Sequence, residues 1–311
     1  MMASRPPPPA KLDWASLNLA NLPAVNGHVE CRFSASKQTW SEPQFVADPY
    51  VKIHGLAPGL NYGQQVYEGL KAFRTADDGA IRVFRPQAHA ARLRHSAAMV
   101  MLPAVPDALF LECVRLAVAG NAAFVPPPSA QGGFLYIRPV LFGAAKQLML
   151  SPSDETVLAV YASPGTAYHG EQALDAVVLD EFDHAAPRGA GSGKLGGNYA
   201  SVWRYQKRAQ AQGFHLTLHL DSATRSLVEE FSTSGVLGVT TTSDGKEATP
   251  KVYLPETSNA IHSITSDSLL ILAAQCGWQV LIEEVTFSSL DMFQELFAVL
   301  GNRRFRRYRV P

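Results

Sequence analysis

The sequence predicts a mixed α/β (α+β) protein built from two domains. Its 311 residues suit two domains of the usual size, about 150 residues each. Segments with strand-like and helix-like patterns occur together in both halves of the chain. Between the halves, residues 163–172 contain Pro164, Gly165 and Gly170, which are typical of a loop. We therefore expect a first, smaller domain over residues 1–162, an interdomain loop over 163–172 and a second domain over 173–311.

The composition allows a large core and argues against several kinds of partner. Hydrophobic residues make up 47% of the chain, charged residues 17%, and the formal net charge is zero. A neutral chain argues against broad binding to nucleic acid or to anionic membranes, and no apolar run approaches the roughly 20 residues that cross a bilayer. The three cysteines, Cys31, Cys113 and Cys276, stand far apart without metal or redox spacing. We expect a cytoplasmic protein without a metal site.

The first half begins with strand-like segments. Residues 45–54 alternate roughly between apolar and polar side chains. Asp78-Gly79 predicts a hairpin turn between strands over 70–74 and 80–84. The other elements expected in this half are helices over 89–101 and 106–122 and strands over 134–142 and 155–161.

The second half contains two helices that are marked by the glycine after each of them. Residues 199–212 precede Gly213, and residues 264–276 precede Gly277. Asp244-Gly245 predicts another hairpin turn. The strands expected in this half cover residues 174–179, 214–220, 227–230, 236–242 and 278–285. His215 and His219 lie on one face of such a strand, about 13 Å apart, which is too far to share a metal ion.

Lys194 stands among five glycines between Gly189 and Tyr199. Glycines let a backbone approach a small ligand closely, and a lysine amine can attack a carbonyl group. The ordinary role of such a lysine is a solvated charge on a loop. A P-loop would need Ser or Thr where Leu195 follows the lysine. From Gly191 the segment does match G-x-G-x-x-G, so a nucleotide-binding oxidoreductase stays an alternative, although no strand directly precedes these glycines.

Six segments in a fixed order carry a resemblance to a known family. They are Asn61 to Arg74, Phe84 to Leu93, Tyr136 to Pro139, Gly193 to Tyr199, Glu230 to Ser234 and Ser263 to Ser268. The chain resembles the branched-chain amino acid aminotransferases, which are class IV pyridoxal-phosphate enzymes, and most of all their fungal members. The similarity extends from about Leu12 to Val299. It implies a two-domain fold with the cofactor between the domains, a homodimer, and amino-group exchange between leucine, isoleucine or valine and 2-oxoglutarate.

The resemblance also implies a pyridoxal 5′-phosphate site. Lys194 would hold the cofactor as a Schiff base and carry the proton during transamination. Glu230 would face the pyridine nitrogen, whereas its rival Glu229 projects to the opposite face of the strand. The ordinary role of two adjacent glutamates at a strand end is solvent exposure. The other implied cofactor contacts are Arg92 with the amides of Ile264 and Thr265 for the phosphate, and Tyr199 for the ring oxygen. Alternatives to Arg92 are Arg85, Arg94 and His95.

For the substrate, the resemblance implies an aromatic wall and one arginine. Tyr62, Tyr67 and Tyr136 would surround an aliphatic side chain. Arg138 would meet the distal carboxylate of glutamate. Lys71 lies at a position where many relatives have arginine or lysine, without an assigned role.

The sequence departs from the family pattern in two places. Gly235 replaces an asparagine, and after Val299 the Gly-Thr-Ala-Ala turn of the relatives is replaced by a segment with five arginines near the end. That turn donates hydrogen bonds to the cofactor phosphate and to the substrate carboxylate, so we expect weaker binding, an unpaired sheet edge and a frayed basic tail. A misread gene end, a non-catalytic relative, a specialised-metabolism enzyme and a sister activity on the same scaffold, such as D-amino acid transfer, stay open as alternatives.

Overall fold

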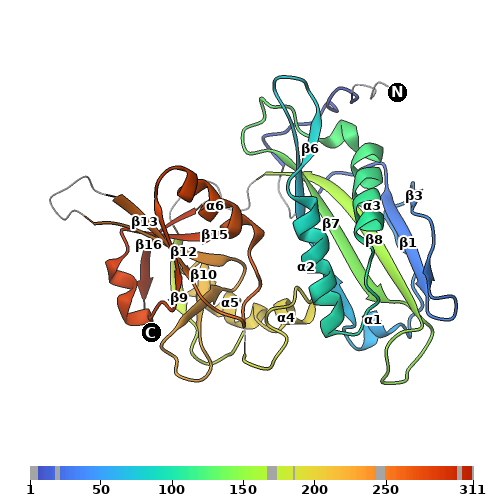
Figure 1. The fold of residues 1–311 in the computed structure, drawn as a ribbon. Helices are drawn as coiled ribbons and strands as arrows, with labels where there is room; N and C mark the ends of the chain where they lie inside the picture. Colours follow the sequence, from blue (N-terminus) through green and yellow to red (C-terminus); the bar gives the residue numbers. More distant parts are fainter. Residues whose placement is uncertain are drawn as a thin grey trace. The chain divides into compact units, whose positions relative to one another are not determined.

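A computed structural model describes most of the chain as two compact units (Figure 1). The described residues are 6–17, 22–166, 174–184, 186–242, 249–299 and the backbone of 303–309. The first unit comprises Met1–Tyr168 together with Lys194–Gly196, and the second comprises His169–Gly193 and Gly197–Pro311. The three residues Lys194–Gly196 thus belong to the first unit, although they lie within the second half of the sequence.

The first unit contains an eight-stranded sheet whose strand pairs are all antiparallel. The strand order is β2-β1-β8-β7-β5-β6, with β3 beside β1 and β4 beside β7. The strands are β1 (His28–Ser34), β2 (Thr39–Trp40), β3 (Gln44–Val46), β4 (Gln65–Tyr67), β5 (Leu70–Arg74), β6 (Ile81–Val83), β7 (Phe134–Gly143) and β8 (Glu155–Gly165). The predicted hairpin of residues 70–74 and 80–84 is confirmed as β5 and β6.

Two long helices of the first unit pack beside this sheet (Figure 1). Helix α2 (Pro86–Met99) begins with a proline, whose fixed φ suits the first helical turn. Helix α3 (Asp107–Gly120) buries Phe110, Cys113 and Ala117, which recur at helical spacing, against β1, β7 and β8. The shorter elements are α1 (Pro58–Asn61) and the 3₁₀ turn η1 (Ala122–Phe124).

The second unit contains another eight-stranded sheet, which mixes parallel and antiparallel pairs. Its order is β11-β10-β9-β16-β15-β12-β13-β14. The strands are β9 (Leu174–Val178), β10 (Leu216–Leu220), β11 (Val228–Phe231), β12 (Gly235–Thr242), β13 (Thr249–Pro255), β14 (Gln279–Glu283), β15 (Glu295–Val299) and β16 (Arg303–Arg309). The helices are α4 (Gly197–Ala200), α5 (Trp203–Ala211), α6 (Ile264–Gln275) and the 3₁₀ helix η2 (Phe287–Met292).

Several expectations from the sequence need correction. The strand expected over residues 45–54 reduces to the end of β3, because Pro49 has no backbone N–H to donate to a neighbouring strand. The single helix expected over 199–212 is two helices, α4 and α5. The expected unpaired edge and frayed tail after Val299 are wrong, because β16 lies between β15 and β9 and pairs with both.

Two expectations concern segments that the structure covers only in part. The predicted turn Asp244-Gly245 lies outside the described residues, and so does most of the expected loop 163–172, whose first three residues belong to β8. Among the helices of the described residues, none combines the length and the apolar character that a bilayer crossing requires.

Candidate active site

Lys194 is fixed to the first unit through its backbone. Its N–H donates to the hydroxyl of Ser96 at 2.9 Å, and its carbonyl oxygen accepts from the amide of Tyr67 at 3.0 Å. The next residue, Leu195, forms an antiparallel bridge with Val66 on β4. These non-local bonds hold the lysine in one place, which the glycine-rich sequence around it would not do by itself.

The side chain of Lys194 lies over the ring of Tyr67. Its Nζ atom is 4.6 Å from the ring centroid, and the guanidinium carbon of Arg138 is 4.7 Å from the same centroid. Arg138 also donates from Nη2 to the hydroxyl of Tyr136 at 2.8 Å. The structure therefore brings together four residues that the sequence singled out, with the Tyr67 ring shared by both cations.

The third tyrosine of the predicted wall has a different neighbour. Tyr62 is 45% exposed, and its hydroxyl donates to the carbonyl oxygen of Leu148 at 2.7 Å. Its place in a substrate wall stays a prediction.

Glu68 is a residue of this region that the sequence reasoning did not single out. It is completely buried, and its carboxylate accepts from Arg92 Nε at 2.6 Å and from Arg92 Nη2 at 2.8 Å. Its Oε2 atom also lies 2.6 Å from Nδ1 of His89. Burial raises the pKa of Glu68, but the hydrogen bonds and charges of Arg92 and His89 outweigh burial and lower that pKa to about 2. Glu68 is therefore an ionised, fully bonded anchor for Arg92.

Helix α2 presents the partners of Glu68 and Lys194 on one face. His89, Arg92 and Ser96 are spaced by three and four residues, which places them one above another on a helix. Ser96 donates its hydroxyl to the carbonyl of Arg92 at 3.0 Å and accepts from Lys194. The sequence does contain a signal for Glu68, because it stands at every second position with Val66 and Leu70, a spacing that places all three on one face of an extended segment. All three are buried in the structure.

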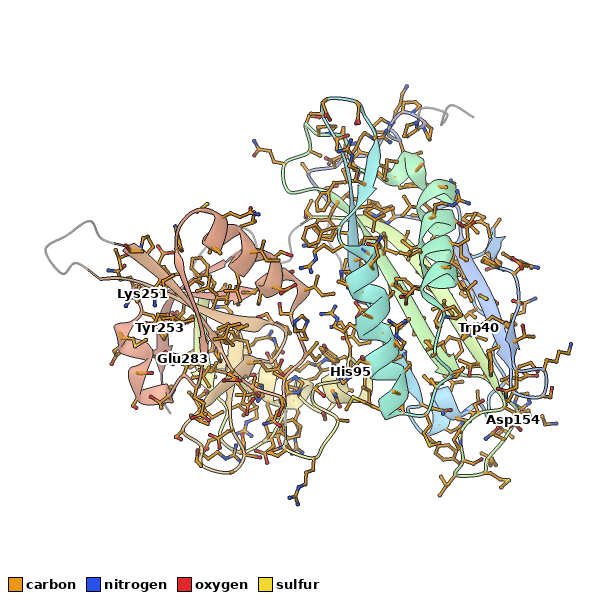
Figure 2. The ribbon with its side chains drawn as sticks, in the orientation of Figure 1. Trp40, His95, Asp154, Lys251, Tyr253 and Glu283 are labelled. Atoms are coloured by element: carbon orange, nitrogen blue, oxygen red, sulfur yellow. The ribbon has the colours of Figure 1, made fainter. Side chains whose placement is uncertain are left out.

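Arg92 differs clearly from the alternatives considered for the phosphate. Its side chain is only 13% exposed and is oriented by two bonds to Glu68. Arg94 pairs with Asp107 at the surface, and His95 is an exposed residue of α2 (Figure 2). Arg85 directly precedes the helix and has a left-handed backbone conformation. The role of Arg92 toward a phosphate stays a prediction.

In the second unit, both adjacent glutamates are buried on β11. Glu229 and Glu230 are each 6% exposed. Solvent exposure, the ordinary role of such a pair, applies to neither of them. The carboxylate of Glu229 accepts from Asn259 Nδ2 at 2.9 Å and from the hydroxyl of Thr257. Glu230 is paired in register with His219 on the neighbouring strand β10.

A group of aromatic side chains lies near this strand. His219 is 1% exposed, and its ring is 4.9 Å from that of His184, which in turn lies 6.2 Å from the ring of Tyr199. Nε2 of His219 lies 3.2 Å from the hydroxyl of Thr217. Burial, together with the nearby His184, lowers the pKa of His219 to about 3, so its imidazole is neutral at physiological pH. His219 is thus a buried packing group, whereas His215 is exposed.

The glycine loop that leads to Tyr199 is closed by an asparagine. Asn198 donates from Nδ2 to the carbonyls of Ala190 at 2.7 Å and Gly193 at 3.1 Å. The amide of Gly193 also bonds back to Ala190 at 3.1 Å. These bonds join the loop before α4 to the start of the helix, where Tyr199 is half-buried.

The start of α6 lies against the turn between β11 and β12. Ser263 caps the helix by accepting from the amide of Ser266 at 3.1 Å, and Ile264 and Thr265 follow in the first turn. A Cβ atom on Gly235 would lie 3.3 Å from the Ser266 hydroxyl, so the β11–β12 turn packs closely against this helix end. In the second unit, the buried hydroxyls of Ser232, Ser234 and Ser266 have no hydrogen-bond partner among the described residues.

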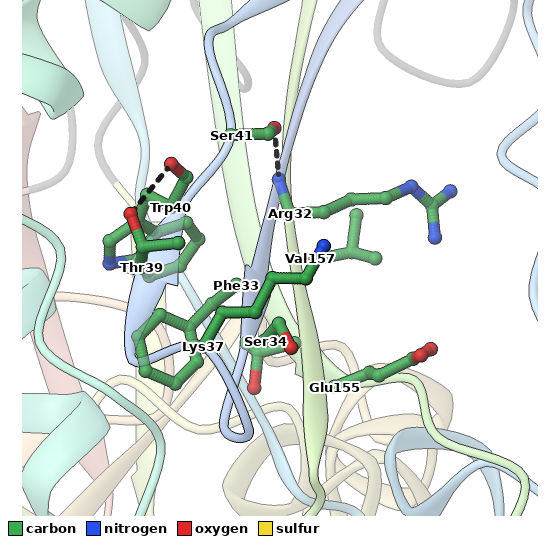
Figure 3. A pocket seen from close by; sticks show the side chains of 10 residues that line it. Arg32, Phe33, Ser34, Lys37, Thr39, Trp40, Ser41, Glu155 and Val157 are labelled. Atoms are coloured by element: carbon green, nitrogen blue, oxygen red, sulfur yellow. Dashed lines mark hydrogen bonds between the residues drawn. The ribbon is translucent and has the colours of Figure 1, made fainter.

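The first unit also has a pocket that lies away from the residues described above. A pocket of about 300 Å³ opens beside β1, β2 and β8, where Phe33, Lys37 and Trp40 are among its lining residues (Figure 3). None of the residues singled out above lines it. Among the described residues, no group of three or more His, Cys, Asp or Glu side chains is arranged to hold a metal ion.

Comparison with known proteins decides the family. The family model described as amino-transferase class IV matches residues 65–301. The chain belongs to the class IV aminotransferases. Aminotransferases of this family depend on pyridoxal 5′-phosphate and act on amino and oxo acids, so the nucleotide-binding oxidoreductase is no longer an alternative.

Curated relatives of this aminotransferase share nearly half of its residues. The transaminase AMT5 of Alternaria alternata is 46% identical over 93% of this chain and 76% of its own length. The aminotransferase TOXF of Cochliobolus carbonum is 45% identical over 94% of this chain and 82% of its own length. These names state an aminotransferase and no substrate.

Solved structures of branched-chain enzymes share the fold of this aminotransferase. That of Escherichia coli is 26% identical, with a TM-score of 0.69 over 85% of this chain and 84% of the other. That of Thermobaculum terrenum in its pyridoxal-phosphate form is 18% identical, with a TM-score of 0.69 over 91% and 86%. The predicted class IV fold is confirmed.

The residues of the two units suit the chemical parts of the cofactor. A phosphate needs neutral donors and a cation, and the start of α6 with the buried Ser234 and Ser266 hydroxyls supplies donors of that kind. A protonated ring nitrogen needs a carboxylate, and Glu230 is a buried one. The first unit, taken by itself, contains a cation in the largely buried Arg92 and an amine in Lys194.

Proposed function

We propose that this aminotransferase exchanges the amino group of leucine, isoleucine or valine with 2-oxoglutarate. The observation that supports this specificity is the group formed by Tyr67, Tyr136 and Arg138 beside Lys194. The two aromatic rings offer apolar surface to an aliphatic side chain, and the guanidinium offers a partner to a distal carboxylate. One group of residues thereby accepts both kinds of substrate in turn.

In this proposal each residue has a defined task. Pyridoxal phosphate, when bound, supplies a carbonyl that accepts the amino group and a ring that withdraws electrons from the substrate Cα. Lys194 contributes its amine as the group that moves the Cα proton, and the Ser96 and Tyr67 backbone bonds keep that amine in place. Glu230 keeps the ring nitrogen protonated, Tyr199 binds the ring oxygen, and the phosphate is held by Arg92, Ile264 and Thr265.

The specificity is tested by substituting Arg138. We expect Arg138→Gln to raise KM for 2-oxoglutarate by about 10- to 100-fold, because a hydrogen bond to a charged group contributes about 1.5–3 kcal/mol, while KM for leucine changes little. Arg115→Gln, an exposed arginine on α3, is the matched control and should leave both values unchanged. Equal effects of Arg138→Gln on both substrates would contradict this role.

A panel of amino donors distinguishes the branched-chain proposal from a specialised or sister activity. Purified protein is assayed with 2-oxoglutarate and with leucine, isoleucine, valine, aromatic amino acids and D-amino acids. The proposal requires the three branched-chain amino acids to give the highest kcat/KM. A higher value for any other donor would reassign the substrate, and no turnover with any donor would favour a non-catalytic relative.

We also propose a homodimer in the cytoplasm. The connection between β7 and β8 exposes three neighbouring apolar side chains, Leu148, Met149 and Leu150, at 56%, 73% and 87%. Such a patch favours association with another protein surface. All three cysteines are free thiols, which suits a reducing compartment. Sedimentation analysis of the purified protein should give twice the mass of one chain, and cell fractionation should place it with cytoplasmic markers.

A further inference from the structure

Glu229 belongs to a closed network of hydrogen bonds in the second unit. One carboxylate oxygen accepts from Nδ2 of Asn259 at 2.9 Å, and the other accepts from the hydroxyl of Thr257. The backbone amide of Asn259 donates to the same Thr257 hydroxyl at 3.0 Å. Both side chains that bind the carboxylate are neutral. The position of this buried glutamate is therefore defined by hydrogen-bond geometry rather than by an opposite charge.

Both donors lie on the connection between β13 and α6. This connection leaves β13 at Pro255 and reaches the helix cap at Ser263, and Asn259 lies midway along it. The amides of Ile264 and Thr265 follow directly after the cap. Glu229 therefore ties the segment before the helix start to strand β11.

Strand β11 also carries Glu230, the carboxylate proposed for the ring nitrogen. The turn that follows this strand packs against the same helix start, since a Cβ atom on Gly235 would lie 3.3 Å from Ser266 Oγ and 3.4 Å from Ser263 Cβ. The strand and the helix start are thus joined at two places, on the preceding connection through Glu229 and on the first turn through Gly235.

We infer that Glu229 is a positioning residue for the cofactor phosphate. It holds the start of α6 at a fixed place relative to Glu230, so that phosphate donors and ring partner match one cofactor molecule. Glu229 acts through Thr257 and Asn259 and does not itself contact the cofactor. The inference rests on the proposed roles of Glu230, Ile264 and Thr265.

A comparison of two ligands tests this role. Dissociation constants of pyridoxal phosphate and of pyridoxal, which lacks the phosphate, are measured by absorbance with apoprotein of the wild type, Glu229→Gln and Glu229→Ala. We expect Glu229→Ala to raise the dissociation constant of pyridoxal phosphate by about tenfold, the equivalent of one hydrogen bond to a charged group. The dissociation constant of pyridoxal should rise by less than about twofold. Glu229→Gln keeps one acceptor oxygen and should fall between wild type and Glu229→Ala.

Two further variants connect the effect to the network. Glu256→Ala removes an exposed glutamate from the same connection and should leave both constants unchanged. Introduced alone, Thr257→Val should weaken the binding of pyridoxal phosphate. Introduced into the Glu229→Ala variant, it should weaken this binding little further, because both substitutions remove the same contact.

The outcomes separate this inference from the proposals beneath it. A wild type that prefers pyridoxal phosphate, together with a Glu229→Ala variant that loses affinity for both ligands equally or for neither, overturns the role of Glu229 alone. A wild type without any preference for the phosphate overturns the roles of Ile264 and Thr265 and this inference with them. The branched-chain specificity is untouched by either result, because no amino donor enters the measurement.

Discussion

Two buried glutamates, one in each unit, are held by partners of different kinds. Glu68 in the first unit is bound by a guanidinium and an imidazole, whereas Glu229 in the second unit is bound by an amide and a hydroxyl. The first arrangement depends on ionisation of the carboxylate. The second depends on the geometry of neutral donors. The comparison shows that the two glutamates depend on different features of their surroundings, namely Glu68 on the charges of its partners and Glu229 on the geometry of neutral donors.

The largest expected effect is a loss of stability of the second unit in acid, caused by His219. In the unfolded chain a histidine takes up its proton near pH 6.5, whereas in the folded protein the pKa of His219 is lowered to about 3. Between these values the unfolded state binds a proton that the folded state does not, so stability is lost as the pH falls from 6.5 to about 3. At about 1.4 kcal/mol per pKa unit the loss reaches about 5 kcal/mol.

This effect is measured by urea unfolding at a series of pH values. Tryptophan fluorescence is recorded from a variant that keeps only Trp203 and Trp278, which both lie in the second unit. His219→Asn should flatten the dependence on pH in this range, while His215→Asn, at an exposed position, should leave it unchanged. A slope that survives His219→Asn would show that other groups cause it.

The next largest effect concerns removal of the buried charge in the first unit. Glu68→Gln leaves the Arg92 guanidinium without its anionic partner, and breaking a buried ion pair costs about 3–5 kcal/mol of unfolding free energy. Glu229→Gln should cost less, about 1–2 kcal/mol, because its partners are neutral. Glu155→Gln, an exposed glutamate, should lie within about 0.5 kcal/mol of wild type. Equal costs for Glu68→Gln and Glu229→Gln in urea titrations would remove the contrast between the units.

A third prediction follows from the lowered pKa of Glu68. Its pKa is about 2 in the folded protein, against an ordinary value of 4.5. The ion pair therefore contributes its full stability above pH 4.5, and about 3 kcal/mol is lost as the pH falls toward 2. With fluorescence from Trp14 and Trp40 in the first unit, Glu68→Gln should remove this loss. A first unit that weakens at the same pH as the second would contradict the assignment.

The smallest effect concerns a glycine beside the substrate wall. A Cβ atom on Gly69 would lie 2.2 Å from the Tyr136 hydroxyl oxygen. Gly69→Ala therefore has to displace the side chain of Tyr136, whose hydroxyl accepts from Arg138. We expect the binding free energy of 2-oxoglutarate to weaken by about 1 kcal/mol, which would raise its KM by about fivefold. Gly63→Ala is unsuitable as a control because its φ is positive, whereas Gly55→Ala adds a methyl group in open space and should have no effect. An unchanged KM in Gly69→Ala would place the Tyr136 ring outside the substrate site.

The sequence predicts the elements whose patterns are local. Helix α3 and the β5–β6 hairpin were expected within a few residues of their observed bounds, because helical spacing, a turn dipeptide and prolines are visible in short windows. The break between α4 and α5 was missed, because the amide of Val202 bonds to the carbonyl of Tyr199, three residues back, and this turn leaves no mark in the helical spacing of the sequence.

The site was only partly accessible from the sequence for the same reason. Family resemblance singled out Lys194, but its attachment to the first unit depends on Ser96, which is 98 residues away. The burial of Glu229 depends on Thr257 and Asn259, which come from a segment 28 and 30 residues further along. Such long-range partners leave no periodicity in the sequence. The pairing of β16 with β15 and β9 was hidden by its high charge.

The most direct test of the whole account is to locate the residue that binds the cofactor. Protein mixed with pyridoxal phosphate is reduced with borohydride, digested and examined by peptide mass spectrometry, with Lys71→Met as a matched lysine control in the same unit. We predict the pyridoxyl label on Lys194 in the wild type and in Lys71→Met, and neither label nor cofactor colour in Lys194→Ala. A label on another residue, or full colour in Lys194→Ala, would contradict it.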